Sequence, residues 1–455
     1  MPVSGFPELL PSQRFVELTV IDALRESFEL HGFTPLETPA VESLDQLVRK
    51  GEIDKEVYVL RRLHAEEGED AGLGLHFDLT VPFARFVLEN AGRLEFPFRR
   101  YQIQPVWRGE RPQEGRYRQF TQADIDIVGR GELPFHHDVE VARVMAEALA
   151  KLTFLPPARI QVNNRRLIEG FYLGLGATDT AAVMRAIDKL DKVPADVVAK
   201  QLREDAGLTD EQASRCLALA EIRSSDASFV DAVRALGVEH ELLDQGLAEL
   251  AAVVQGCASI TAASGGRVSV EADLRIARGL DYYTGTVFET RLSGHESLGS
   301  ICSGGRYDAL ASDGKNTYPG VGISLGLSRL LVPLLAKGVL AGSRSVPSAV
   351  LVALASEDTR AEADAIAQQL RARGIPTEVA ASAQKFGKQI RYAERRGIPY
   401  VWFPAVPSGV AGQAGADASE VKDIRSGEQV PADPATWMPP AEDLHPTVIV
   451  KEARE

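Results

Sequence analysis

The chain has 455 residues, a length that predicts two to four compact domains, since one domain usually takes roughly 100 to 200 residues. Its composition, 45% hydrophobic and 25% charged, is typical of a folded globular protein and argues against disorder or a fibrous repeat. Lys and Arg number 50 against 64 Asp and Glu, giving a net charge of −14. This excludes a protein that wraps nucleic acid by bulk positive charge, and we expect no DNA partner.

The cysteines and the apolar segments bear on the cellular compartment. Cys216, Cys257 and Cys302 have no CxxC spacing, which predicts neither a disulfide framework nor a cysteine zinc site. Residues 1–10 lack a basic region followed by an apolar stretch, and the most apolar later segment, 330–340, is short and contains Lys337. We therefore expect a cytoplasmic protein that does not contact a membrane.

The first third of the chain predicts a helix followed by a hairpin. Apolar residues recur at three-to-four spacing over 12–31, which indicates an amphipathic helix ending at Gly32; they are Phe15, Leu18, Ile21, Leu24 and Phe28. Segments 101–107 and 120–128 are rich in β-forming residues and flank a polar, charged loop at 108–118. This pattern predicts an antiparallel hairpin with a long loop.

The later segments predict an interrupted first body and a separate second one. Helical patterns fill about 163–264, strands are expected at 268–274 and 286–292, and a glycine-rich run, 299–326, leads into a helix at 327–335. After a linker at 338–347, strands alternate with helices as far as 403. We interpret this as a helical insertion in the first body, followed by a small α/β domain with a mostly parallel sheet.

Three segments contain candidate ligand-binding residues, each with an ordinary structural alternative. Residues 99–118 contain six Arg and two Glu, which favours an anionic partner, although a solvated charged hairpin has the same composition. Arg278 precedes Tyr282 and Tyr283, and these side chains could form a polar ligand-binding pocket. The structural alternative is that a strand begins here and that both tyrosines belong to the core. Segment 303–308 has two glycines directly before Arg306. Glycines allow the backbone to approach a ligand closely, but two glycines are equally consistent with a plain turn.

The glycines at 320, 322 and 326 do not have GxGxxG spacing, and no GxxxxGK[ST] sequence is present. A Rossmann site and a P-loop are therefore not predicted. Any nucleotide must bind through arginines on a sheet.

Together these segments resemble the histidyl-tRNA synthetase family of class II aminoacyl-tRNA synthetases. Pro39 after a helix is similar to motif 1, residues 108–129 to motif 2, and 320–330 to motif 3. Arg278-Gly-Leu-Asp-Tyr-Tyr283 and Ser303-Gly-Gly-Arg-Tyr-Asp308 resemble the two signatures specific to the histidine enzyme. The segment 77–80, Phe-Asp-Leu-Thr, resembles the eukaryote-like subgroup, while His76 and Ser328 depart from the common residues.

The resemblance implies an α+β catalytic domain on a mostly antiparallel sheet (1–165 and 266–338), a helical insertion (166–265) and a C-terminal α/β anticodon-binding domain (347–455). It implies ATP-dependent ligation of L-histidine to tRNA(His) through histidyl adenylate, with Mg²⁺ bound to ATP and no metal assigned to protein residues. A homodimer formed around Pro39 is also implied.

The implied site residues fall into four groups. Arg108 and Arg278 are catalytic, and ATP binds Arg108, Arg116, Phe120 and Arg329. Histidine binds Asp78, Thr80, Gln122, Asp126, Arg278, Tyr282 and Tyr283, with Asp126 and Tyr283 on the ring nitrogens. Gln113 and Arg118 face the tRNA acceptor end.

Segment 384–396, with five Lys or Arg and one Glu, suits RNA phosphates or a solvated helix face.

Two other functions use this fold: histidine-sensing regulatory subunits of the first histidine-biosynthetic enzyme, and sensor domains of translation-regulating kinases. The regulatory subunits typically lack the C-terminal domain and the arginine signatures, both of which this chain has. A kinase signature is absent, and other class II synthetases would lack segment 278–283.

Overall fold

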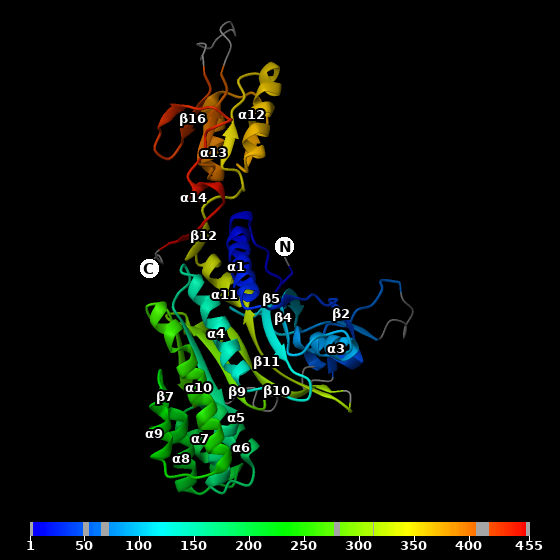
Figure 1. Ribbon diagram of the computed structural model, residues 1–455, viewed down its shortest axis with the longest axis vertical. Helices are drawn as coiled ribbons and strands as arrows, with labels where there is room; N and C mark the ends of the chain where they lie inside the picture. The colour runs from blue at the N-terminus through cyan, green and yellow to red at the C-terminus, as the bar shows by residue number, and fades with distance from the viewer. Residues whose placement is uncertain are drawn as a thin grey trace. The chain divides into compact units, whose positions relative to one another are not determined.

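The computed structural model describes residues 3–48, 54–64, 72–276, 283–312, 314–405 and 418–451 (Figure 1). The chain divides into two compact units, one formed by residues 1–7 and 21–333 and the other by 8–20 and 334–455. Most of the segments expected to form the first body and its helical insertion share the first unit, whereas residues 8–20 and 334–338 belong to the second. The expected division at 165 and 265 stays a prediction.

The first unit is built on a nine-stranded sheet with strand order β1-β4-β5-β11-β10-β9-β6-β8-β7. Its strands are β1 (Thr34–Pro35), β4 (Phe98–Trp107), β5 (Gln119–Val128), β6 (Ala158–Asn164), β7 (Arg223–Ser224), β8 (Val268–Asp273), β9 (Thr286–Leu292), β10 (Cys302–Ser312) and β11 (Thr317–Gly326). Among the described strands of this sheet, only the β1–β4 and β6–β8 pairings are parallel. The expected mostly antiparallel sheet is confirmed. A separate small ribbon pairs β2 (Val41–Ser43) with β3 (Leu73–Leu75).

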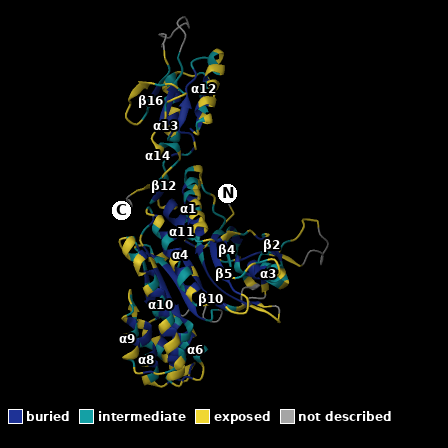
Figure 2. Cartoon of the chain, in the orientation of Figure 1, coloured by how far each residue is buried: buried dark blue, intermediate teal, exposed yellow. Residues whose placement is uncertain are grey.

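The predicted hairpin forms from β4 and β5, which pair antiparallel with Gln104 opposite Gln122. Strand β5 lies near the middle of the sheet and is buried from Gln122 to Val128. Figure 2 shows the buried interior of this unit in dark blue. Helices of this unit are α2 (Leu44–Leu47), α3 (Thr80–Asn90) and α4 (His136–Lys151), with single turns η2 (Asp54–Glu56) and η4 (Glu296–Leu298). The part of α1 (Pro11–Leu30) from residue 21 onward and the part of α11 (Leu327–Ala336) up to residue 333 also belong to it.

Helix α1 confirms the predicted helix, but its buried face matches the expected one only in part, at Leu24 and Phe28. The fully buried side chains are Val16, Val20, Leu24 and Phe28, whereas Leu18 is exposed. Both sets have helical spacing, so periodicity alone could not choose between them. Tertiary packing selects the stripe at four-residue spacing.

The inserted segment is helical, as expected. It comprises α5 (Arg165–Gly174), α6 (Thr180–Ile187), η3 (Asp188–Asp191), α7 (Ala195–Glu204), α8 (Asp210–Glu221), α9 (Phe229–Arg234) and α10 (Glu241–Ala263). A Cβ added at Gly170 would lie 2.2 Å from the Leu243 nitrogen, and one at Gly246 would lie 2.1 Å from the Leu167 nitrogen. The close approach of α5 and α10 therefore requires these two glycines.

Helix α10 is long and apolar enough to cross a membrane by length and composition. Its apolar side chains Leu243, Leu247, Leu250, Val253 and Val254 are buried inside the protein, and the helix packs on α4, α5 and β8. These contacts are those of a core helix.

The second unit contains a five-stranded sheet, ordered β14-β13-β15-β16-β17, and a short β12–β18 pair. The strands are β12 (Leu340–Gly342), β13 (Val350–Val352), β14 (Thr377–Val379), β15 (Tyr400–Phe403), β16 (Glu420–Asp423), β17 (Gln429–Pro431) and β18 (Val448–Val450). The helices are η5 (Glu357–Thr359), α12 (Arg360–Ala372), α13 (Phe386–Arg396) and α14 (Ala441–Leu444).

The expected alternation of strands and helices is confirmed in this unit, but the prediction of a mostly parallel sheet is wrong. Strand β13 pairs parallel with β14 and β15, whereas β15–β16 and β16–β17 are antiparallel. Strands β16 and β17 are joined by a short turn in which Gly427 has φ +81°. So short a connection can only join antiparallel neighbours, since a parallel pair needs a crossover.

Candidate active site

The first hollow of interest, which we name the arginine cleft, lies where the β4–β5 hairpin meets the end of β11 and the start of α11. It is lined by Arg108, Glu110, Gly115, Arg116, Tyr117, Phe120, Gln122, Ser300, Ile301, Ser303, Ser324, Gly326 and Arg329. Three guanidinium groups line it, and Glu110 is its one acidic residue. Its charge therefore favours an anionic ligand.

The arginines of the cleft are held by short-range contacts. Arg108 donates from Nε to the Phe77 carbonyl at 3.0 Å, and its guanidinium carbon lies 5.1 Å from the Phe120 ring centroid. Arg329 donates to the carbonyls of Gly115 and Ser300, both at 2.7 Å. Glu110 lies 3.8 Å from Arg108 and 3.4 Å from Arg116. A planar, preorganised guanidinium of this kind suits phosphate or carboxylate recognition.

The second hollow, which we name the inner pocket, adjoins the arginine cleft. It is lined by Thr80, Asp124, Asp126, Tyr283, Ser303, Gly304, Gly305, Tyr307, Gly322, Ile323 and Ser324. Ser303 and Ser324 line both hollows. A ligand in the inner pocket would therefore reach a second ligand in the arginine cleft.

Glycines make room for the polar side chains of the inner pocket. A Cβ at Gly322 would lie 2.1 Å from Asp126 Oδ1, and a Cβ at Gly305 would lie 2.6 Å from Tyr283 Cδ1. Gly304 and Gly305 lie within strand β10, paired with β9 and β11. The plain turn considered for 303–308 is therefore wrong, because these glycines are in the middle of the sheet.

The carboxylates around the inner pocket have defined partners. Asp126 accepts the Tyr307 hydroxyl at 2.7 Å and pairs with the fully buried Arg100 at 2.6 Å. Asp78, at the start of α3, accepts the Val81 amide at 3.0 Å, as a helix-capping carboxylate does. Gln122 donates to Ser324 across strands β5 and β11.

Similarity to known proteins decides the family. The Histidyl-tRNA synthetase family profile matches residues 5–330, and an Anticodon binding domain profile matches 349–403. The chain is 61% identical to the histidine--tRNA ligase of Cutibacterium acnes and 60% identical to that of Micrococcus luteus, in each case over 98% of both chains. The chain belongs to the histidyl-tRNA synthetase family.

Solved structures agree with this family assignment. The crystal structure of histidyl-tRNA synthetase from Nostoc sp. PCC 7120 is 35% identical, with a TM-score of 0.82 over 95% of this chain and 96% of that one. A Bacillus halodurans structure, described as an ATP phosphoribosyltransferase regulatory subunit/histidyl-tRNA synthetase, shares the fold at 22% identity. Its TM-score is 0.69 over 86% of this chain and 96% of that one.

The site residues that the family resemblance implies fall into several groups according to which hollow, helix or loop they belong to. Arg108, Arg116, Phe120, Gln122 and Arg329 line the arginine cleft, and Thr80, Asp126 and Tyr283 line the inner pocket. Asp78 caps α3 beside the inner pocket. Gln113 and Arg118 belong to the motif 2 loop and line neither hollow. Arg278 and Tyr282 lie outside the described residues.

Two of the arginines counted as a basic cluster at 99–118 are already paired within the protein. Arg99 contacts Glu140 at 3.0 Å, and Arg100 contacts Asp126. Arg306, in the second signature, makes an ion pair of 2.7 Å with the buried Asp138 and donates to the Leu133 carbonyl at 3.0 Å. It therefore fixes the start of α4 and does not line the inner pocket.

Three residues of the site were missed in the sequence: Arg100, Asp124 and Tyr307. Asp124 and Asp126 alternate on β5, which was a usable signal that both face one side of the sheet. Tyr307 belongs to the signature at 303–308, which marked its segment but not its role, and Arg100 gave no comparable signal. Both roles depend on strands β4 and β10 lying on either side of the β5–β11 pair.

Both departures from the family pattern have a structural setting. His76 is fully buried, stacks on Trp107 at 5.5 Å between ring centroids, and has its Nε2 2.8 Å from the Pro105 carbonyl. Burial lowers the pKa of His76, which favours a neutral ring. Ser328 accepts the Thr121 amide at 2.9 Å and so joins α11 to β5.

Proposed function

We propose that this chain activates L-histidine with ATP and transfers it to tRNA(His), with the arginine cleft holding ATP and the inner pocket holding histidine. The observation that carries the proposal is that the two hollows adjoin and share Ser303 and Ser324. The first step joins a carboxylate to a phosphate, so the two substrates must meet at such a boundary.

In the first step an oxygen of the histidine carboxylate attacks the α-phosphorus of ATP, and pyrophosphate leaves. Positioning and charge stabilisation supply most of the acceleration in such a reaction. Arg108 would bind the α-phosphate, Arg116 the γ-phosphate, and Arg329 would stack on adenine opposite Phe120. Both phosphate arginines are near Glu110 and could exchange that partner for phosphate oxygens.

The donors available for Mg²⁺ are few. Among the described residues there is no group of three or more His, Cys, Asp or Glu side chains that could hold a metal ion. Glu110 is the acidic residue of the arginine cleft. ATP would therefore supply most of the ligands of Mg²⁺, which neutralises phosphate charge, with Glu110 as the available protein carboxylate.

Selection of histidine requires polar groups that an analogue without the ring nitrogens would leave unpaired. Asp126 and Tyr283 would contact the ring, and Asp78, Thr80 and Gln122 would hold the α-amino group. Arg278 and Tyr282 would complete the pocket, with Arg278 meeting the α-phosphate and the histidine carboxylate.

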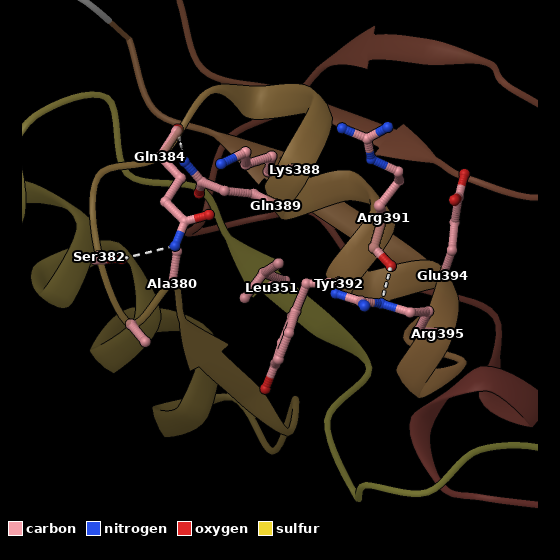
Figure 3. Close-up of a pocket in the computed structure, with 11 residues that line it drawn as sticks. Leu351, Ala380, Ser382, Gln384, Lys388, Gln389, Arg391, Tyr392, Glu394 and Arg395 are labelled. Carbon is pink, nitrogen blue, oxygen red and sulfur yellow. Dashed lines mark hydrogen bonds between the residues drawn. The ribbon is translucent and has the colours of Figure 1, made fainter.

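In the second step the histidyl group passes to the 3′ end of tRNA. The motif 2 loop, with Gln113 and Arg118, would face the acceptor end. In the second unit a groove along α13 is lined by Lys388, Arg391 and Arg395, with Tyr392 beside them (Figure 3). Basic and aromatic side chains together suit phosphates and unstacked bases, so this groove would receive the anticodon.

Helix α13 is held against the sheet by Gln389, which exchanges two hydrogen bonds with the Leu354 backbone at 2.8 and 2.9 Å. The basic side chains therefore project from a fixed support.

The three cysteines are buried free thiols, which suits the reducing cytoplasm where tRNA is charged.

Purified protein should exchange pyrophosphate into ATP when L-histidine is present, and not with proline, threonine or glycine. The physical reason is that only histidine pairs the polar groups of the inner pocket. Labelled pyrophosphate in a filter assay measures the exchange. Histidine binding without exchange would show a regulatory subunit, and equal exchange with another amino acid would show another synthetase.

The chain should also form a homodimer through the motif 1 segment. Pro39 is exposed in the single chain, and the nearby Leu30 and Val48 are 72% and 47% exposed. Apolar side chains exposed along one segment favour an isologous interface. Light scattering at micromolar concentration should give twice the chain mass of 49.3 kDa. A fully active monomer would contradict this arrangement.

A further inference from the structure

A third hollow, which we name the side chamber, lies on the same face of the nine-stranded sheet as the arginine cleft and the inner pocket. Ser303 lines both of those hollows and is directly opposite Glu289 on β9, which in turn is directly opposite Gln161 on β6. Directly opposite residues of paired strands project from one face. Glu289 and Gln161 both line the side chamber, whose volume is about 160 Å³. The side chamber is therefore next to the boundary where ATP and histidine would meet.

The charges around the side chamber are almost balanced. Four arginines and five acidic residues line it. Asp273, which is 1% exposed, lies 2.9 Å from Arg223 and accepts a hydrogen bond from the Gln161 side-chain amide. Asp191 lies 2.9 Å from Arg291. Because these charges offset one another, the side chamber favours a neutral ligand that has hydrogen-bonding groups of its own.

Three buried polar atoms of the residues that line the side chamber have no hydrogen-bond partner within the described part of the chain. They are Gln161 Oε1, Arg275 Nε and Arg291 Nε. Gln161 is 6% exposed, and its Nε2 donates to Asp273, so Oε1 is the amide atom left for a ligand. A buried polar atom without a partner is costly, which points to a ligand that offers one donor and accepts from an arginine.

The edge of an adenine ring has this pattern, because its exocyclic amino group donates and the neighbouring ring nitrogen accepts. Glutamine is one of the side chains that commonly pair with adenine. Gln161 is two strands away from Ser303, a separation of roughly 10 Å at the usual strand spacing. That separation is comparable with the span of a nucleoside from its ribose hydroxyls to the far edge of its base.

We propose that the side chamber receives the base of the 3′-terminal adenosine of tRNA. Gln161 Oε1 accepts the amino group of the base, and Arg275 Nε donates to a ring nitrogen. Arg275 is the freer of the two arginines, since it lies 3.9 Å from Asp191 whereas Arg291 lies 2.9 Å from it. This inference rests on the proposed function and deepens it, because it names where the third substrate is held. The ribose hydroxyl then reaches the histidyl carbonyl near Ser303.

A tRNA(His) that ends in purine riboside tests the amino contact, because this nucleoside lacks only the exocyclic amino group. With the parent protein and subsaturating RNA, single-turnover transfer from preformed histidyl adenylate should be about threefold to tenfold slower than with ordinary tRNA, the usual effect of losing one hydrogen bond. Gln161→Met keeps the length of the side chain and removes the acceptor, so the two RNAs should react at equal rates. Equal rates with the parent, or an undiminished preference in Gln161→Met, would overturn the inference.

Pyrophosphate exchange separates the side chamber from the other two hollows, because Gln161 lines neither of them. Histidine-dependent exchange by Gln161→Met should stay close to the parent rate, while its transfer to ordinary tRNA falls about threefold to tenfold. Loss of exchange by the same factor as transfer would show a general structural role and would overturn the inference. If the parent protein shows no histidine-dependent exchange, the proposed function fails before this question arises.

Arg275→Met tests the second contact and leaves Gln161 in place, so the inference stays testable even where Gln161→Met folds poorly. The Arg275 side chain is 33% exposed, and its ion pair with Asp191 is long, so the melting temperature should hardly change. Transfer to ordinary tRNA should slow about threefold to tenfold, while the preference for adenosine over purine riboside remains.

Arg215→Met is the matched control, because Arg215 is an exposed arginine of the inserted segment and does not line the side chamber. This variant should transfer histidine at the parent rate. Equal losses for Arg275→Met and Arg215→Met would show a diffuse effect of charge and would overturn the inference.

Discussion

Replacing Arg100 by methionine should lower the free energy of unfolding by about 3–5 kcal/mol, the usual cost of leaving a buried charge without its partner. Arg100 is fully buried, pairs with Asp126 at 2.6 Å, and has its guanidinium carbon 4.3 Å from the centroid of the Phe83 ring. Methionine fills similar space but leaves Asp126 uncompensated. Urea denaturation of the two proteins measures the difference.

The neighbouring Arg99 provides a control for this variant. Its ion pair with Glu140 is partly exposed, with 30% of the arginine side chain accessible, so Arg99→Met should cost no more than about 1 kcal/mol. Adding Asp126→Asn to Arg100→Met should recover much of the lost stability, because the orphaned charge is removed. Equal losses for Arg99→Met and Arg100→Met would contradict the buried ion pair.

Replacing Arg108 by alanine should lower the rate of adenylate formation about a hundredfold or more, the usual effect of removing one donor that meets developing charge. Arg108 is held by the Phe77 carbonyl at 3.0 Å and lines the arginine cleft, which suits the contact with the α-phosphate that we propose for it. Arg108→Lys should also be poor, because an ammonium cannot form the planar fork. Single-turnover adenylate formation with saturating ATP and histidine measures the effect.

Arg111 is the matched control, because it is an exposed arginine of the same loop and does not line the arginine cleft. Arg111→Ala should form adenylate at nearly the parent rate. Melting temperatures of all three variants separate a lost contact from a lost fold. An Arg108→Ala protein that folds normally and keeps the parent rate would show that the cleft does not act through this residue.

Local sequence patterns were sufficient for much of the fold. The alternation around 108–118 predicted the β4–β5 hairpin, and the helical spacing at 12–31 predicted α1 within one residue at each end. Segment 163–264 was correctly read as helical because helix formation depends mainly on near neighbours in the chain. The family motifs then pointed to the residues that line both hollows.

Pairings between distant segments could not be read in the same way. The sequence counted Arg99 and Arg100 in a basic segment that favours an anionic partner, yet each has a carboxylate partner on another element. The buried stripe of α1, the antiparallel strands β16 and β17, and the need for Gly170 and Gly246 all depend on which surfaces meet. These are non-local contacts, which periodicity does not encode.

The sequence by itself determined the chemical character of this protein: arginine-rich segments that suit an anionic ligand, signatures of the histidine enzyme, and an acidic chain with local basic segments. The tertiary structure alone decided which of the two aspartates on β5, Asp124 or Asp126, forms the close ion pair with Arg100. Arg100 reaches Asp126 at 2.6 Å and Asp124 only at 4.0 Å, a difference set by the registry of β4 against β5. A charge-assisted hydrogen bond can form at the shorter distance and not at the longer one, so the registry determines which carboxylate Arg100 holds.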